Sequence, residues 1–287
     1  MEPLTIDGEY AHQTTMYTDA MDATRFASQE QPRMTSIKQD NSASETGKNR
    51  TLNVTAVEAT GLEKSFGNVA VLRGLDMTIR DGQAVAIFGA NGVGKSTLLR
   101  LLTTLSRPDH GSISVYGRDL SKEAESARLT IGTVLHSPML YGDMTVKENL
   151  TFFGKMFRIG NLSDRINEIS NRLGLIPRLD QRARELSHGY QKRTAIARSM
   201  LHKPRILLFD DAETGLDQPA IKILDDVISD YRTPGHSVVM TTHSIERGIA
   251  NADRVLVIAG GRIALDASAS NVTPVDVTSL YSDPVYS

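Results

Sequence analysis

The chain has 287 residues, of which 40% are hydrophobic, so it is long enough to bury the core of one large or two modest domains. Its 32 Lys and Arg residues against 34 Asp and Glu residues leave a formal net charge of -2, which excludes the overall basic field that drives nucleic-acid or membrane-surface binding. The absence of cysteine excludes disulfides, thiolate-held zinc, iron–sulfur clusters and a Cys nucleophile. We therefore expect a cytoplasmic protein with no nucleic-acid partner.

Residues 1–51 are rich in Ser, Thr, Gln, Asp and Glu and show no sustained hydrophobic period, which predicts a disordered N-terminal arm. Met34 is an alternative start of the chain, and N-terminal sequencing would decide between the two. The longest apolar runs fall far short of the roughly 20 residues that a membrane helix needs. A role at a membrane therefore requires a partner protein.

The stretch LDMTIRDGQAVAIFG predicts strands. Apolar residues alternate with polar ones at Leu75, Met77 and Ile79. Asp81-Gly82 then predicts a hairpin-type turn into a continuous apolar strand. This part of the chain is expected to be rich in β-structure, with short strands returning up to about Asp119.

A phosphate-binding motif follows that apolar strand and precedes a helical pattern, as the pattern G-x-x-x-x-G-K-[ST] requires. Its glycines let successive backbone N–H groups surround phosphates at a helix N-terminus. Lys95 supplies a positive charge, and the Ser96 hydroxyl is a candidate magnesium ligand. The motif predicts an ATP-binding loop made of Gly89, Ala90, Asn91, Gly92, Val93, Gly94, Lys95, Ser96 and Thr97.

A helical region is predicted between Thr145 and Arg184, within a helical subdomain of about residues 137–186. It opens with TVKE, a capping box in which Thr145 and Glu148 satisfy each other's end of the first turn. A second amphipathic helix is predicted around residues 166–173, with Gly174 as its stop.

Strands recur at Arg205–Asp210, Ser237–Thr241 and Val255–Ala259, separated by helical stretches. This alternation is typical of a parallel sheet built from βαβ units. The residues from about 268 to 287 are expected to form a loose C-terminal tail.

Two adjacent carboxylates end the strand in LLFDDAETGLD. An acid at the end of a strand next to a phosphate loop can hold the magnesium shell, which is the role expected for Asp210. Asp211 would then lie beside the γ-phosphate, where a carboxylate can orient and polarise the attacking water.

Three further stretches, ELSHGYQKRTAIARSMLHKP, LLFDDAETGLD and VVMTTHS, stand with the phosphate loop in the order and spacing of the ATP-binding cassette of ABC transporters. The resemblance covers residues 52–267. It implies an α/β fold of the P-loop NTPase ABC type, a RecA-like core with an antiparallel β subdomain and a helical subdomain. It also implies ATP and Mg2+ as cofactors and a separately encoded transmembrane permease subunit as partner, through which alone the chain associates with the cytoplasmic face of the membrane.

The resemblance assigns further roles. A loop containing Ser187 and Gly189 would reach the γ-phosphate bound by the opposite subunit, so that two cassettes, identical or different, sandwich two ATP molecules. His243 would be the switch histidine at the γ-phosphate, Asp217 would lie at the dimer interface, and Phe66 would stack on adenine.

The runs LHSPMLYGDMTVKENL and ADRVLVIAGGRIALD resemble the cassette subunit of haem exporters in cytochrome c maturation. The cargo implied is haem or another small molecule, although the membrane partner, and not the cassette, selects the cargo. A further apolar set, which includes Tyr141, Phe152 and Met156, is a candidate groove for a helix of the permease.

Several positions depart from the cassette pattern. His136 stands where a magnesium-contacting Gln is usual, His188 and Tyr190 replace Gly and Gln in the loop at residues 186–190, and Ala212 replaces Pro. Asp211 stands where Glu is usual, which withdraws the carboxylate by more than about 1 Å and predicts slow hydrolysis with nucleotide binding intact.

Two alternatives remain open. One is a non-transport cassette that acts as a soluble ATP switch in translation or DNA repair. The other is a degenerate, binding-only subunit that pairs with an active cassette, an alternative raised by Asp211 and His136.

Overall fold

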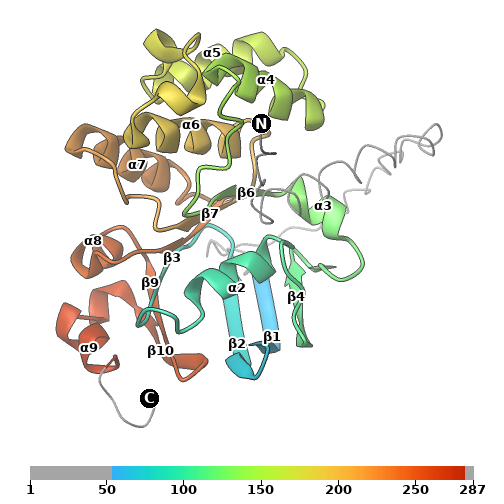
Figure 1. Cartoon of the computed structure of the whole chain (residues 1–287). Helices are drawn as coiled ribbons and strands as arrows, with labels where there is room; N and C mark the ends of the chain where they lie inside the picture. The colour runs from blue at the N-terminus through green and yellow to red at the C-terminus, as the bar shows by residue number, and fades with distance from the viewer. Residues whose placement is uncertain (1–53, 282–287) are drawn as a thin grey trace, which may run out of the picture. The chain divides into compact units, whose positions relative to one another are not determined.

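The computed structural model of the chain describes residues 54–281, so the arm expected at residues 1–51 lies outside the described residues. Two sheets and the helices around them make up this part (Figure 1). A four-stranded antiparallel sheet has the order β2-β1-β4-β5, and a six-stranded sheet has the order β10-β9-β3-β8-β7-β6. The strands are β1 (Thr55–Phe66), β2 (Val69–Arg80), β3 (Ala84–Phe88), β4 (His110–Val115), β5 (Arg118–Asp119), β6 (Ile131–Val134), β7 (Ile206–Asp210), β8 (Ser237–Thr241), β9 (Arg254–Ala259) and β10 (Arg262–Ser268).

Five strands of the six-stranded sheet, from β9 to β6, run parallel, and β10 is antiparallel at the edge. The expected α/β fold class and the three strands that the sequence predicts after residue 204 are therefore confirmed. The helices are α2 (Lys95–Leu102), α3 (Ala124–Arg128), α4 (Val146–Met156), α5 (Leu162–Arg172), α6 (His188–Met200), α7 (Gln218–Asp230), α8 (Ile245–Ala250) and α9 (Pro274–Ser279), with 3-10 turns at Ile176–Arg178, Ala183–Glu185 and Ala269–Asn271.

The parallel sheet is buried on both faces, because alternate side chains of each strand enter two separate cores. Val85 and Ile87 of β3 pack with α2 and the antiparallel sheet, whereas Ala86 and Phe88 pack with the helices on the opposite face. Figure 1 shows α2 and the antiparallel sheet on one side of the parallel strands and α4 to α7 on the other. Continuous apolar runs are the consequence, as expected for parallel strands.

The expected hairpin at Asp81-Gly82 is wrong, because the turn carries the chain from one sheet into the other. β2 pairs with β1, and β3 pairs with β8 and β9. The Asp81 carboxylate accepts hydrogen bonds from the Tyr116 hydroxyl (2.6 Å) and the Gly235 N–H (2.7 Å), which fixes the crossing point. The Arg205 guanidinium lies 3.5 Å from the centroid of the Tyr116 ring.

Helices α4 and α5 occupy the segment that the sequence predicts to be helical. The capping box of Thr145 and Glu148 is present at the start of α4, and Gly174, with φ of 65°, follows the end of α5. The side chain of Asn149 is fully buried, and its amide accepts from the Tyr141 N–H and donates to the carbonyls of Tyr141, Met144 and Thr145 at 2.8–3.2 Å. One side chain therefore fastens the loop before α4 to the helix.

The loose tail expected from residue 268 is wrong for residues 268–281. Helix α9 begins with a capping box of Thr273 and Asp276, and Val277 is completely buried. The polar composition gave no sign of this short helix, of which Val277 packs on the main core while Val275 stays exposed. Among residues 54–281, no helix combines the length and the apolar composition that crossing a bilayer requires.

Replacing Asn149 by alanine should lower the free energy of unfolding by about 1 to 3 kcal/mol, because the buried backbone groups lose their hydrogen-bond partners. Urea unfolding of the wild type and the variant measures this difference. Asn171→Ala, an exposed position on α5, is the control and should leave stability nearly unchanged. Equal losses in both variants would contradict the role given to the buried amide.

Candidate functional site

The phosphate-binding motif forms the connection between β3 and α2. Gly89 has φ of 153°, and a Cβ there would lie 2.6 Å from the Ile258 carbonyl oxygen. Gly94 has φ of 115°, and a Cβ would lie 2.8 Å from a methyl group of Leu72. Glycine is required at both positions, because any other residue would have a strained backbone and a Cβ that clashes with its neighbours.

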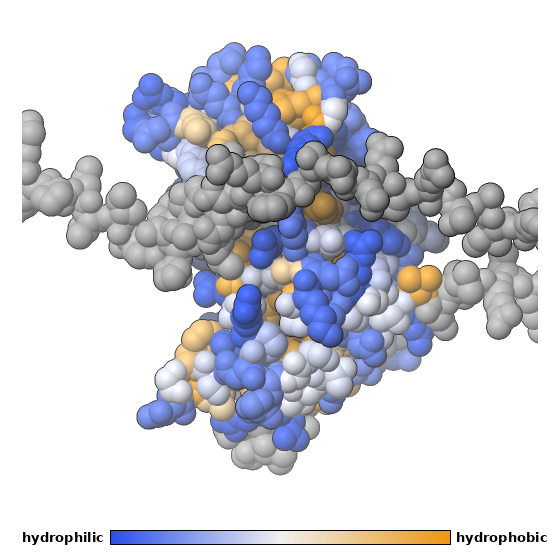
Figure 2. Space-filling view, turned by 90° about the vertical axis from the view of Figure 1, so that its right-hand side faces the viewer, coloured by the Kyte–Doolittle hydropathy of each residue, from blue (hydrophilic) through white to orange (hydrophobic). Residues whose placement is uncertain are grey.

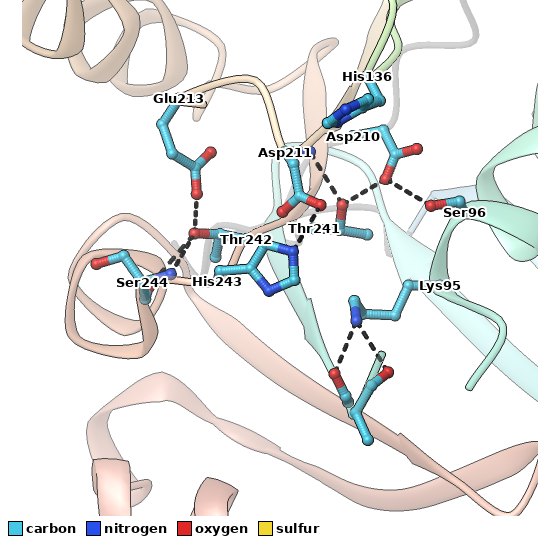
Figure 3. Close-up of polar contacts among 12 residues, drawn as sticks. Lys95, Ser96, His136, Asp210, Asp211, Glu213, Thr241, Thr242, His243 and Ser244 are labelled. Carbon is cyan, nitrogen blue, oxygen red and sulfur yellow. Dashed lines mark hydrogen bonds and ion pairs between the residues drawn. The ribbon is translucent and has the colours of Figure 1, made fainter. Parts of the chain in front are cut away.

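Lys95 opens helix α2 and bends back over the loop that precedes it (Figure 3). Its ammonium donates to the carbonyl oxygens of Gly89 (2.7 Å) and Ala90 (3.1 Å). Burial lowers the pKa of Lys95, and the neighbouring Asp211 and Asp210 oppose that shift. The loop thus encloses a positive charge next to two carboxylates.

Asp210 ends β7 and lies between two hydroxyl groups. Its Oδ1 accepts from the Thr241 hydroxyl (2.7 Å) and from the Ser96 hydroxyl (3.1 Å). The register of the sheet explains the first bond, because Asp210 and Thr241 are paired across β7 and β8. Ser96 and Asp210 together offer the oxygen ligands that Mg2+ prefers, with room in its shell for phosphate oxygens and water.

Asp211 faces His243 across the carboxyl ends of β7 and β8 (Figure 3). Its Oδ2 lies 3.1 Å from Nε2 of His243, whereas its buried Oδ1 has no hydrogen-bond partner in the described part of the chain. Burial raises the pKa of Asp211, and the nearby His243 opposes that shift. A carboxylate at a strand end beside the phosphate loop can accept a hydrogen bond from a bound water.

The remaining predicted residues contact other partners. Phe66 ends β1 with half of its surface exposed, and the Lys64 ammonium lies 5.7 Å from its ring centroid. His136 is exposed, and its backbone carbonyl accepts from the buried ammonium of Lys192 at 3.0 Å. Ser187 precedes α6 as its N-cap residue.

The loop at residues 186–190 adjoins the segment that leads to Asp217. A Cβ at Gly189 would lie 3.6 Å from the Gly215 carbonyl oxygen. Tyr190, one of the two unusual residues of this loop, has the guanidinium groups of Arg178 and Arg193 each 5.1 Å from its ring centroid. Arg193 in turn forms a 3.1 Å ion pair with Asp217, so the loop and Asp217 are joined within one subunit.

Sequence reasoning missed three residues of this region. Thr241 bridges the two acids, since its hydroxyl donates to Asp210 and accepts from the Asp211 N–H. Its position two residues before His243 could have identified Thr241 from the sequence. The second missed residue is Lys192, which no sequence pattern indicated. The third is Tyr281, which lies in the segment expected to be a loose tail; burial raises the pKa of its hydroxyl, and the nearby Gly89 backbone opposes that shift.

Comparisons with known proteins agree with this geometry. Residues 72–214 match the family model described as ABC transporter. The chain is 34% identical over 217 residues to the Nod factor export ATP-binding protein I of Rhizobium sp. (strain N33), covering 74% of this chain and 71% of that protein. It is 33% identical over 198 residues to the ABC transporter ATP-binding protein NatA of Bacillus subtilis (strain 168), covering 68% of this chain and 80% of that protein.

A solved structure of the ATP-binding subunit of an ABC transporter shares the fold, with a TM-score of 0.72 at 23% identity. The match covers 80% of this chain and 95% of that chain. The arrangement of sheets and helices is therefore common to the two proteins as a fold.

Asp211→Asn should raise the melting temperature near neutral pH. Because the folded pKa of Asp211 is raised, its ionised form destabilises the folded state above that pKa, and the cost disappears once pH falls below the unfolded value. The gain should therefore be larger at about pH 8 than at about pH 5. Thermal unfolding across this range tests it, with the exposed Asp230→Asn as control; a gain that does not change with pH would contradict the argument.

Proposed function

Because the chain belongs to the ABC transporter family as an ATP-binding subunit, we propose that it binds and hydrolyses MgATP to power a separate transmembrane permease subunit. The supporting observation is the convergence of the phosphate loop, two strand-end acids and a histidine on one edge of the parallel sheet. Ligands of open α/β sheets bind at the carboxyl ends of the strands, which is where these groups lie.

In this proposal the loop from Gly89 to Thr97 binds the phosphates through its backbone N–H groups and Lys95. Ser96 and Asp210 would hold Mg2+, which supplies charge neutralisation on the phosphate oxygens. His243 would contact the γ-phosphate, and Phe66 would stack on adenine. His136 is the weakest member, because its backbone and not its ring is engaged in the contact with Lys192.

Asp211 is proposed to orient and polarise the attacking water through its carboxylate. Its Oδ2 lies 3.1 Å from His243 Nε2, its Oδ1 is buried, and its short side chain keeps both oxygens close to the strand end. Turnover should therefore be slow, since a misplacement of about 1 Å costs on the order of a hundredfold in rate. If turnover is absent altogether, the chain is the binding-only partner of an active cassette.

A dimer of cassettes is part of the proposal. Ser187 and Gly189 would reach the nucleotide of the opposite subunit, with Asp217 at the interface. The ion pair from Arg193 to Asp217 supports a rigid loop on this side of the subunit, since the two segments would approach a partner as one surface. Both a homodimer and a heterodimer are compatible with these contacts.

The permease is proposed to dock on the helical region, at the cytoplasmic face of the membrane. Tyr141, Phe152 and Met156 are half-buried and pack on the main core, with the Tyr141 and Phe152 rings 5.1 Å apart. Figure 2, which shows the right-hand side of Figure 1, has hydrophobic residues gathered in its upper part, at the height of α4 and α5 in Figure 1. A partly exposed aromatic cluster is suited to receive an apolar helix face.

The cargo is proposed to be haem or another small molecule. Support for haem, and for the cytochrome c maturation type, rests on the runs LHSPMLYGDMTVKENL and ADRVLVIAGGRIALD. The similar proteins include a Nod factor export ATP-binding protein, so related cassettes serve different cargoes.

Lys95→Ala should abolish magnesium-dependent ATP hydrolysis, with a loss of at least about a hundredfold, because the loop loses its charge on the phosphates. Asp211→Glu should raise turnover by up to about a hundredfold, because the longer side chain brings the carboxylate closer to the water. Steady-state phosphate release measures both. Turnover that survives Lys95→Ala would indicate a contaminating ATPase and contradict the assigned site.

Met156→Ala should weaken recovery of the membrane partner in co-purification from detergent extracts, because the partner loses part of its apolar contact. ATP binding should remain, since the side chain lies on α4, away from the phosphate loop. Ile176→Ala, at an exposed apolar position of the same region, is a matched control. Undiminished recovery with Met156→Ala would contradict this docking surface.

A further inference from the structure

Glu213 follows the two strand-end acids by two residues and has both carboxylate oxygens engaged. Its Oε1 accepts a hydrogen bond from the Thr242 hydroxyl, and its Oε2 lies 3.6 Å from the Arg247 guanidinium. The Glu213 and Arg247 side chains are largely buried, at 16% and 15% exposure. Because both oxygens have partners, Glu213 is not a spare base for the reaction.

Thr242 links this carboxylate to the segment that carries the histidine. Its side chain is buried, donates to Glu213 and accepts from the Ser244 N–H at 3.0 Å. The hydrogen bond between the Thr242 hydroxyl and the Ser244 N–H links the two residues that flank His243 (Figure 3). The same hydroxyl connects this segment to Glu213.

The histidine closes a ring of contacts. His243 Nε2 lies 3.1 Å from Oδ2 of Asp211, and Asp211 lies only two residues before Glu213. The loops at residues 211–213 and 242–244 are therefore joined at both ends, by the Thr242–Glu213 hydrogen bond and the His243–Asp211 contact. Asp211 has φ of 47°, a conformation that persists only where the surroundings hold it.

Arg247 balances the charge of the buried Glu213. It lies on α8, and it also pairs with Asp225 of α7. Two helices are thus connected to the Glu213 carboxylate, which resists its displacement. A buried carboxylate with a charged and a hydroxyl partner is stable in one orientation.

We propose that Glu213 is a positioning residue, which holds His243 against Asp211 through the Thr242 hydroxyl. This inference rests on the proposed hydrolysis site, because it concerns the geometry of that site. In this proposal Glu213 acts on neither nucleotide nor water directly. Its effect passes through Thr242 to the imidazole and the strand-end acid.

The experiment compares two matched pairs of variants. Glu213→Ala removes the acceptor and the charge, whereas Glu213→Gln removes the charge and keeps an acceptor for Thr242. Thr242→Val removes the hydroxyl at constant shape, whereas Thr242→Ser keeps it. Asp230→Asn, which breaks an exposed ion pair with Arg172, controls for loss of an acid elsewhere.

Glu213→Ala and Thr242→Val should each lower kcat for ATP by about tenfold or more, with KM changed by less than about twofold. Glu213→Gln and Thr242→Ser should keep at least about half of the wild-type kcat, since the hydrogen bond remains. A purely structural role would lower the melting temperature without this rescue. Equal losses in Glu213→Gln and Glu213→Ala would overturn the proposal.

A second readout does not need hydrolysis. The ring signals of His243 can be identified among the seven histidines by their absence in His243→Gln, using two-dimensional NMR of the imidazole groups. They should move in Glu213→Ala and stay in place in Glu213→Gln. Unchanged signals in Glu213→Ala would overturn the proposal even in an active enzyme, whereas moved signals in a protein without turnover would leave it standing and reject only the proposed hydrolysis.

Discussion

The burial of two adjacent carboxylates at the end of β7 is the constraint on which the site depends. Buried acids are costly unless charges and hydrogen bonds compensate them. Asp210 receives two hydroxyl groups, Asp211 faces His243, and the ammonium groups of Lys95 and Lys192 lie within electrostatic reach. Burial lowers the pKa of Lys192, and the acids oppose that shift. The carboxylates thus favour the charged form of both lysines against the cost of their burial.

The order of the parallel strands brings these groups together. β8 lies between β3 and β7, so its last residue, Thr241, stands between the phosphate loop and the acids. The register pairs Thr241 with both Ile87 and Asp210. Since parallel strands end at the same edge, three separate segments meet there without a long loop. The antiparallel sheet supports α2 from the other side through a shared core.

Local patterns predicted the elements whose information is contained within a few residues. The phosphate loop, the capping box at Thr145 and the continuous strands depend on neighbouring residues and on burial. The short strand β6 escaped prediction because Gly132 weakens its pattern. Gly132 is needed there because a Cβ would lie 2.2 Å from the Ser199 carbonyl oxygen of α6, a contact between distant segments. The prediction of a hairpin at Asp81-Gly82 was wrong for the same reason. Long-range packing decides which sheet the next strand joins.

The sequence by itself determined the fold class, the family resemblance and the identity of the residues at the strand ends, because spacing along the chain and hydrophobic pattern are local properties. Only the tertiary structure decided which of these residues meet. It brought Ser96, Asp210 and Thr241 into one hydrogen-bonded group and left Phe66 half exposed at the end of β1. It also engaged Glu213 with Thr242 and Arg247, a pairing of residues about thirty positions apart. Such contacts depend on strand order and helix packing, and no local pattern contains that information.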